Sequence, residues 1–306
     1  MKSPEEVITK RALKITAAAA LIVFVLSAAV MITTAEQNFQ PAGTNLKFSP
    51  APRTSISYGI QATLNGDGQD FLGESLKVEI RAQGQVDLKI LDSPPDLVRT
   101  SMTVPGIEID ARMPGSDLHG TIRTRQNEVL EVVFNSTGKV SEIRNADVVE
   151  QDFESNISFN QIINDYFPVL PAGPVRPGES WYDTRNLRFP FRGTYLDVIL
   201  RTEYRLDDVL PSPDGPMAFI TTLYTAEVKG EIALDQGSGV FEGQGGGSGF
   251  LHFLVDKGFF SGYQTSFSVQ ARFLVKKGNE VLLSWPFSFE SFSLITLNRF
   301  EPPAIP

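Results

Sequence analysis

The sequence predicts a mainly β protein in which an N-terminal transmembrane helix is followed by curved antiparallel sheets. These sheets would form an open half-barrel or a sandwich-like arrangement with one short covering helix. Three observations lead to this prediction. An apolar segment lies near the N-terminus, period-two alternation runs through most of the later chain, and one later stretch has helical spacing.

The apolar segment at 15–32 is long enough to cross a bilayer, because its 18 residues would cover roughly 27 Å as a helix. Lys10, Arg11 and Lys14 precede it, and the next basic residue is Lys47. By the positive-inside rule, the sequence predicts a cytoplasmic N-terminus at 1–14 and a transmembrane anchor at 15–35. The protein would then lie in the bacterial inner membrane as a single-pass protein with a periplasmic C-terminal domain. Removal of the segment after Ala35 is the alternative.

A retained helix would contact the lipid bilayer and could pack against other membrane helices through its small residues. The candidate packing residues are Ala17, Ala18, Ala19, Ala20, Ser27, Ala28 and Ala29.

Composition excludes several classes of function. The formal net charge is −9, and the first 35 residues carry four basic against two acidic residues, so the exported part has a charge near −11. This argues against binding nucleic acid or an anionic lipid surface. The sequence has no cysteine, which excludes disulfides, thiolate catalysis and iron–sulfur clusters. No cofactor is predicted.

The prolines at 41, 50 and 52 predict an extended linker at 36–53, followed by a β domain at 54–306. In that domain, alternating apolar residues at 56–64 and at 76–82 predict two half-buried antiparallel strands. Asn65 and Gly66 are expected to end the first strand in a turn, and Gly138 and Gly258 to mark further hairpins.

The clearest predicted strands are at 263–275 and 281–289, joined by a turn at Lys277, Gly278 and Asn279. Together they present an aromatic face, which would either fill a core or line a ligand cavity. The candidate residues of this apolar face are Phe267, Phe273, Trp285 and Phe287.

One stretch, 158–167, has apolar residues at helical spacing and stops at Pro168, so it is the predicted covering helix. The prolines that follow it predict a boundary between two halves at 54–167 and 175–306.

Residues that could carry chemistry are scarce. His119 and His252 are the two histidines, and without cysteine they do not make a zinc site. The glycine-rich run at 237–249 lacks the Gly-Lys-Ser/Thr of a phosphate loop and is interpreted as a connector or a bulged strand pair. No catalytic, metal or cofactor-binding residue is therefore predicted, and the chain is predicted not to be an enzyme.

The segment 167–181, FPVLPAGPVRPGESW, resembles a signature of exported bacterial β-rich proteins, in which Pro-Gly-Asp/Glu-Ser-Trp opens a strand. The resemblance implies a curved, incompletely closed sheet with a covering helix, similar to lipoprotein-carrier domains. The combination of one N-terminal span with a β domain also resembles the S subunit of a bacterial photosynthetic reaction-centre light-harvesting complex. The span has no histidine, so the role implied there is structural.

These observations favour a non-enzymatic, single-span membrane protein whose periplasmic β domain stabilises or organises a larger membrane protein complex, with a photosynthetic assembly as one setting. The alternative is a carrier-like module that binds a hydrophobic ligand, such as a lipid, an acyl chain or a lipoprotein.

Overall fold

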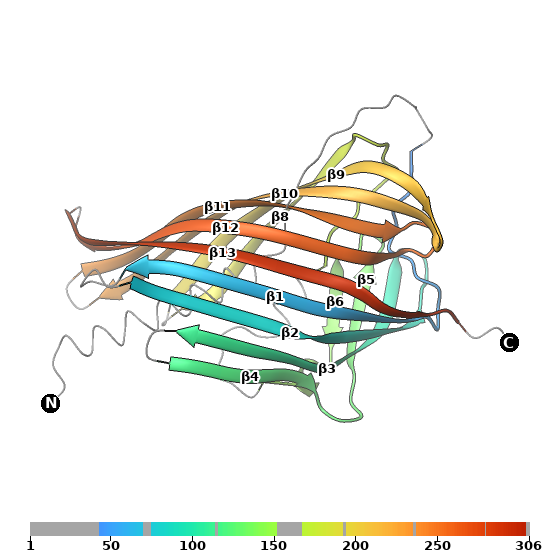
Figure 1. The fold of residues 1–306 in the computed structure, drawn as a ribbon, viewed down its shortest axis with the longest axis horizontal. Coiled ribbons are helices and arrows are strands. Elements are labelled where there is room, and N and C mark those ends of the chain that lie inside the picture. The colour runs from blue at the N-terminus through green and yellow to red at the C-terminus, as the bar shows by residue number, and fades with distance from the viewer. Residues whose placement is uncertain are drawn as a thin grey trace.

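The computed structural model describes residues 43–69, 75–113, 116–151, 167–191, 194–234, 237–278 and 280–303. In these ranges thirteen strands form a single antiparallel sheet (Figure 1). The strands are β1 (Ser55–Gln69), β2 (Ser75–Asp92), β3 (Leu97–Met113), β4 (Ser116–Thr124), β5 (Leu130–Asn135), β6 (Val140–Arg144), β7 (Val149–Gln151), β8 (Ser180–Phe191), β9 (Thr194–Ser212), β10 (Gly215–Leu234), β11 (Gly237–Leu254), β12 (Phe259–Lys277) and β13 (Glu280–Glu301).

The strands form an antiparallel meander, and in the middle of the sheet the first strand, β1, pairs with the last strand, β13. The strand order of the sheet is β6-β5-β3-β2-β1-β13-β12-β11-β10-β9-β8, and β4 pairs with β3 and β7. Because β1 pairs with β13 from Ser55↔Glu301 to Gly68↔Phe287, the two predicted halves share one continuous sheet. The sheet remains open, with β6 and β8 at its edges.

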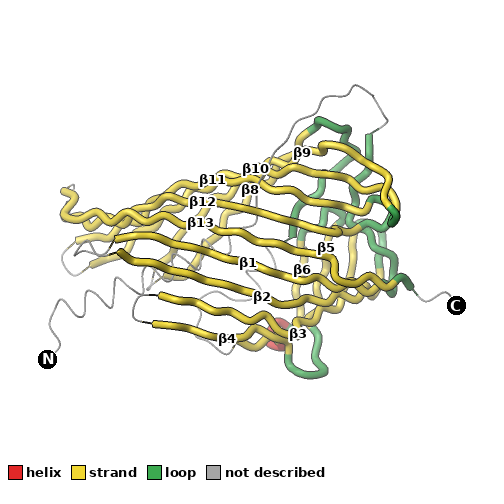
Figure 2. The backbone as a smooth tube through the Cα atoms, viewed as in Figure 1, coloured by secondary structure: helices red, strands yellow, loops and turns green. Residues whose placement is uncertain are grey.

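The sheet curls, and its core fills the concave side. Figure 1 shows the long strands β1–β4 and β10–β13 running across the molecule, with β5, β6 and β8 crossing behind them. Aromatic rings connect β5 and β12 across the core. The ring centroid of Phe48 lies 5.1 Å from that of Phe134 on β5 and 6.1 Å from that of Phe260 on β12. Figure 2 shows that most of the described loops lie at one end, opposite the projecting β12–β13 hairpin.

Strand β3 lets the sheet divide. Its first part, Leu97 to Met102, pairs with β5, and its second part, Ile107 to Met113, pairs with β4. Between these parts lie Pro105, which donates no backbone hydrogen bond, and Gly106. Strand β3 therefore pairs with β2 on one side, and on its other side with β5 along its first part and with β4 along its second part.

The alternation predicted at 56–64 and at 76–82 is confirmed, because the apolar residues of both stretches are buried. The turn predicted at Asn65 and Gly66 is wrong, since β1 continues to Gln69. Gly66 serves a different purpose. A Cβ there would lie 2.7 Å from the ring of Phe289, so glycine lets that ring lie over the backbone of β1.

The predicted fold class needs correction, since the described chain is one open antiparallel sheet rather than sheets combined with helices. Its helical content is a three-residue 3-10 turn at Ala146–Val148. Across the described ranges, no helix is long and apolar enough to cross a membrane. The single-pass inner-membrane location depended on such a helix, and we withdraw it. The anchor at 15–35, with its candidate packing residues, and positions 158–166 of the covering helix lie outside the described residues.

The described end of the predicted linker, residues 43–53, contains no strand and packs against the sheet. Thr44 and Val175 form an isolated β-bridge, and the side chains of Leu46 and Phe48 are buried. The division into two halves is not tested by these contacts and stays a prediction.

Candidate functional site

The predicted apolar face lies inside the core. The exposed fractions of Phe267, Phe273 and Phe287 are 2%, 4% and 7%. Trp285 is partly buried and stacks on Phe273, with ring centroids 5.7 Å apart and planes 7° from parallel. These four side chains therefore pack against one another and against their neighbours, as core residues do.

A hydrogen-bonded pair of tyrosines crosses the middle of this core. The hydroxyls of Tyr224 on β10 and Tyr263 on β12 are 2.5 Å apart, and both side chains are 5% exposed. Strand β11 lies between them. Its core-facing residues at this point are Gly247 and Gly249, which have no side chains, so the two tyrosine side chains can meet over β11. Desolvation by burial raises the pKa of Tyr224 well above its usual value. The pair is therefore neutral near physiological pH.

The neighbouring inner position is also polar and internally bonded. Thr265 on β12 lies 2.7 Å from the hydroxyl of Ser293 on β13, and both residues are buried. Tyr58 donates a hydrogen bond to the carbonyl of Phe260 at 2.8 Å. These hydroxyls on the concave side thus find partners within the protein, as most buried polar groups do, whereas the buried hydroxyl of Thr222 on β10 has no hydrogen-bond partner among the described residues.

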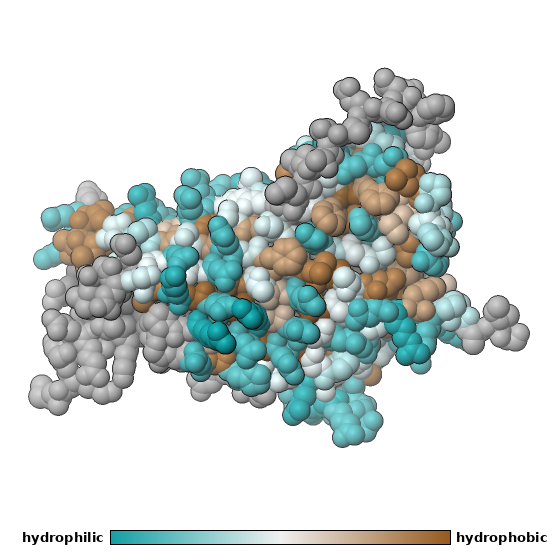
Figure 3. All heavy atoms as spheres, in the orientation of Figure 1, coloured by the Kyte–Doolittle hydropathy of each residue, from teal (hydrophilic) through white to brown (hydrophobic). Residues whose placement is uncertain are grey.

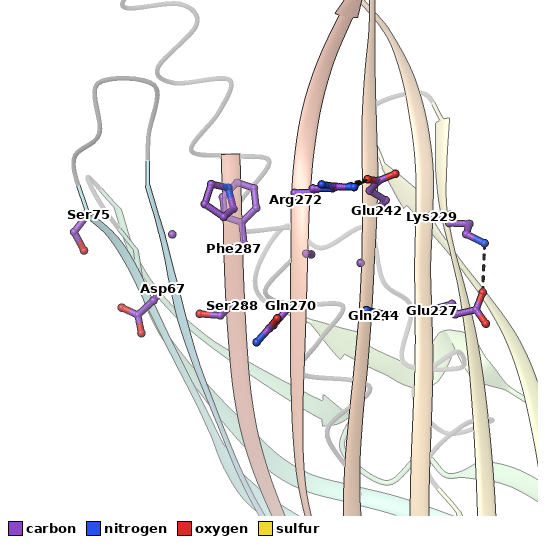
Figure 4. Close-up of a pocket in the computed structure, with 14 residues that line it drawn as sticks. Asp67, Ser75, Glu227, Lys229, Glu242, Gln244, Gln270, Arg272, Phe287 and Ser288 are labelled. Carbon is purple, nitrogen blue, oxygen red and sulfur yellow. Dashed lines mark hydrogen bonds and ion pairs between the residues drawn. The ribbon is translucent and has the colours of Figure 1, made fainter. Parts of the chain in front are cut away.

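The convex side carries a shallow depression of about 1070 Å³ near the projecting end of the sheet (Figure 4). Its labelled side chains come from six strands and are mostly polar or charged. Lys229 pairs with Glu227 at 3.3 Å, and Arg272 pairs with Glu242 at 2.5 Å. Hydrogen bonds from Arg201 and then Lys229 lower the pKa of Glu227. Four of the five charged side chains of the described lining form these two ion pairs, and Asp67 is the fifth. Among the described lining residues, no nucleophile is paired with a general base.

Neither histidine completes a catalytic or metal arrangement. His119 on β4 lies 2.7 Å from Asp110 on β3, and both side chains are exposed. His252 on β11 is half-buried, and burial lowers its pKa. In the part of the chain that the structure describes, no group of three or more His, Asp or Glu side chains could hold a metal ion.

His252 belongs to an apolar group on the convex side, which we name the outer patch. It consists of Leu223, Phe250 and Phe292 with the adjoining Phe219 and His252. His252 packs edge-on against Phe219 at 4.8 Å and stacks on Phe250 at 5.6 Å. Leu223, Phe250 and Phe292 are 37%, 36% and 37% exposed. Figure 3 shows apolar atoms among polar ones on the face that it presents.

The register brings the outer patch together. Leu223 on β10 pairs with Ser248, Ser248 with Ser266, and Ser266 with Phe292 on β13. Two small serines thus separate two apolar side chains in one transverse row, and Phe250 stands in the next row. Sequence reasoning missed this patch because its members lie on the polar side of their strands, where single apolar residues are common.

A second exposed apolar group lies at the end of the β12–β13 hairpin. We name it the hairpin tip, and it comprises Val281, Leu282 and Leu283, which are 50%, 47% and 47% exposed. The prediction placed Val281 and Leu283 on the aromatic face of the strand at 281–289, which would fill a core or line a cavity, but both side chains are about half exposed. Three consecutive apolar residues in a strand, where alternate residues point to opposite sides, were the available signal.

Comparisons with known proteins give no family for this chain. No family model and no curated protein matches. Solved structures that match include the crystal structure of an outer membrane channel from Pseudomonas putida F1, with 9% sequence identity and a TM-score of 0.28. That match covers 85% of this chain and 100% of the channel.

Proposed function

We propose that the protein is non-enzymatic and stabilises or organises a larger protein complex by binding a partner through the outer patch. The observation that carries this proposal is the contrast between the two sides of the sheet. The concave side is filled by its own side chains, whereas the convex side exposes aromatic residues on strands that are otherwise polar.

The chemistry of the outer patch supports a protein partner. Aromatic side chains supply much of the binding free energy at protein interfaces, where they are surrounded by polar residues. Here Phe250 and Phe292 are each more than a third exposed, and the small side chains of Ser248 and Ser266 lie in the row between Leu223 and Phe292. A partner that covered these rings would remove apolar area from water at little conformational cost.

The carrier alternative has less support. Its proposed lining, Phe267, Phe273 and Phe287, is buried within the core. A bound lipid would have to displace packed side chains, which is costly in a close-packed interior. The photosynthetic setting of the complex stays a prediction.

Co-purification tests this proposal. The tagged full-length protein is extracted from its own cells in mild detergent, and its mass is measured on native gels. We expect the wild type to migrate with a complex and the Phe250→Ser, Phe292→Ser variant to migrate alone. Interface aromatics contribute about 2 kcal/mol or more each, so affinity should fall more than about tenfold.

A matched control is Leu210→Ser, because Leu210 is also exposed, at 46%, but lies outside the outer patch. This control should stay in the complex. A wild-type protein that runs as a free monomer would overturn the proposal. If that monomer carried stoichiometric lipid, the carrier function would replace it.

A further inference from the structure

The imidazole of His252 is the titratable group of the outer patch, whose other members are leucine and phenylalanine. Its ring lies edge-on to Phe219, with centroids 4.8 Å apart, and stacks on Phe250 at 5.6 Å. Within the described part of the chain, His252 forms no ion pair and no hydrogen bond. The imidazole is therefore set among apolar rings on an exposed surface.

Charged side chains surround this setting but belong to other contacts. They are Arg205, Asp207 and Asp208 on β9, Asp256 and Lys257 in the turn after β11, and Arg299 on β13. Arg205 pairs with Asp207 at 2.8 Å, Lys257 pairs with Asp214 at 2.9 Å, and Arg299 pairs with Glu301. On β10 and β12, the residues opposite His252 are Phe219 and Gly262, which carry no charge.

The space beside the imidazole is open to a partner. A Cβ built on Gly262 would meet two atoms within 4 Å, the carbonyl oxygen of Ile295 at 3.8 Å and Nδ1 of His252 at 3.9 Å. The next residue in this row is Thr296 on β13, which is exposed. A partner seated on the outer patch can therefore cover the side of the ring that carries Nδ1.

Protonation of His252 and coverage of the outer patch oppose each other. Burial already lowers the pKa of His252 below the ordinary histidine value of about 6.5. A partner would remove more water from the ring, and desolvation disfavours the charged form. Phe219 and Phe250 can attract an imidazolium through their ring faces, but they do so before the partner binds as well as after. That attraction therefore does not favour the complex.

We propose that pH regulates partner binding at the outer patch through His252, which must be neutral for the partner to bind. The inference rests on the proposed function, because it concerns the same surface. An imidazolium would be a charge inside an apolar contact, without an anionic group of this chain to compensate it. The complex is therefore stable at neutral pH and dissociates as the medium becomes acidic.

The dependence of the complex on pH tests this proposal. The complex that co-purifies with the tagged full-length protein is isolated at pH 8 and diluted in series at each pH from 8 to 5. Size-exclusion chromatography with light scattering then gives the apparent Kd. The variants are His252→Phe, which cannot be protonated, and His119→Gln as the matched control. His119 is on β4, where it is exposed beside Asp110 and outside the outer patch.

We expect the affinity of the wild type to fall about tenfold for each pH unit below the pKa of His252 in the free protein. His119→Gln should follow the wild type, and His252→Phe should keep its affinity over the same range. A wild-type profile that matches His252→Phe would overturn the proposal. Tighter binding in acid would also overturn it, since it would mean that the partner supplies a carboxylate to His252.

A second measurement does not depend on how the His252→Phe variant folds. In His119→Gln, His252 is the remaining histidine, so NMR of the imidazole reports its ionisation directly. We expect ionisation below pH 6.5 in the free protein and at still lower pH in the complex. Ionisation at or above pH 6.5 in the free protein would overturn the regulation while leaving partner binding intact. Absence of a complex even at pH 8 would instead reject the partner, and the regulation with it.

Discussion

Tyr224 and Tyr263 share a hydrogen bond of 2.5 Å across an intervening glycine-rich strand. The two residues are 39 positions apart in sequence and belong to strands that do not pair with each other. Their contact depends on the small inner positions of β11. This hydrogen bond links β10 to β12 within the core.

The two tyrosines of this pair should be energetically coupled, so that replacing both destabilises the fold by less than the sum of the two single replacements. Tyr224→Phe removes one hydroxyl, so the buried Tyr263 hydroxyl loses this partner at a cost of about 1 to 3 kcal/mol. The Tyr224→Phe, Tyr263→Phe double variant should cost less than the sum of the two single changes. Urea unfolding of all four proteins measures the coupling, and strict additivity would show that the contact contributes nothing.

Alkaline pH should destabilise the protein through its buried tyrosines. Desolvation raises the pKa of Tyr224, Tyr58 and Tyr204 in the folded state. In the unfolded chain a phenol ionises near pH 10, so above about pH 10 the unfolded state releases protons that the folded state retains. The stability contributed by these groups is therefore present below pH 10 and declines as pH rises further.

Unfolding free energies measured across this range should show that decline, with a shallower slope for Tyr224→Phe. The phenolate absorbance of the buried tyrosines should appear together with loss of the β signal in circular dichroism. Reversible ionisation of all tyrosines in a folded protein would contradict this prediction.

Trp181 should contribute strongly to stability at the start of β8. Its ring stacks on Tyr204 at 5.5 Å, and its indole N–H donates a 2.7 Å hydrogen bond to the carbonyl of Val169. Trp181→Ala should cost about 3 kcal/mol, the low end for such a truncation, because the side chain is only partly buried. An unchanged melting temperature would show that the stack is not formed in solution.

Gly84 should not tolerate a side chain, because β2 passes close to β3 where the latter divides. A Cβ at this position would lie 2.3 Å from the carbonyl oxygen of Gly106 and 2.6 Å from Cα of Ile107. Both are backbone atoms, so Gly84→Ala should cost about 1 to 3 kcal/mol through overpacking. Gly173→Ala is the control, since a Cβ there would meet nothing within 4 Å. Equal melting temperatures for the two variants would be evidence against this close approach.

The sequence was a good guide to which residues of each regular strand are buried. Period-two alternation identified the buried faces of β1, β2 and β12, where every second side chain enters the core. It could not identify β11 as a long strand, because alternation cannot be read from glycines. It also placed a turn at Gly66, where the requirement for glycine comes from Phe289 on another strand.

The candidate surfaces were harder to predict because they depend on register. Phe250 and Phe292 are 42 residues apart, and only the pairing of β11, β12 and β13 brings them to one face. The hairpin tip could have been suspected from its three consecutive apolar residues. Their exposure depends on the pairing of β13 in the sheet, since its described pairing with β1 ends at Gly68↔Phe287.

Site-specific photo-crosslinking in cells tests the central claim, that the convex side binds a protein partner, most directly. A photoreactive phenylalanine analogue replaces Phe292 in the outer patch, and the same analogue replaces Leu210 as the control. The account predicts that position 292 forms a discrete protein adduct and that position 210 does not. An absence of any adduct at position 292, or adducts with lipid alone, would contradict it.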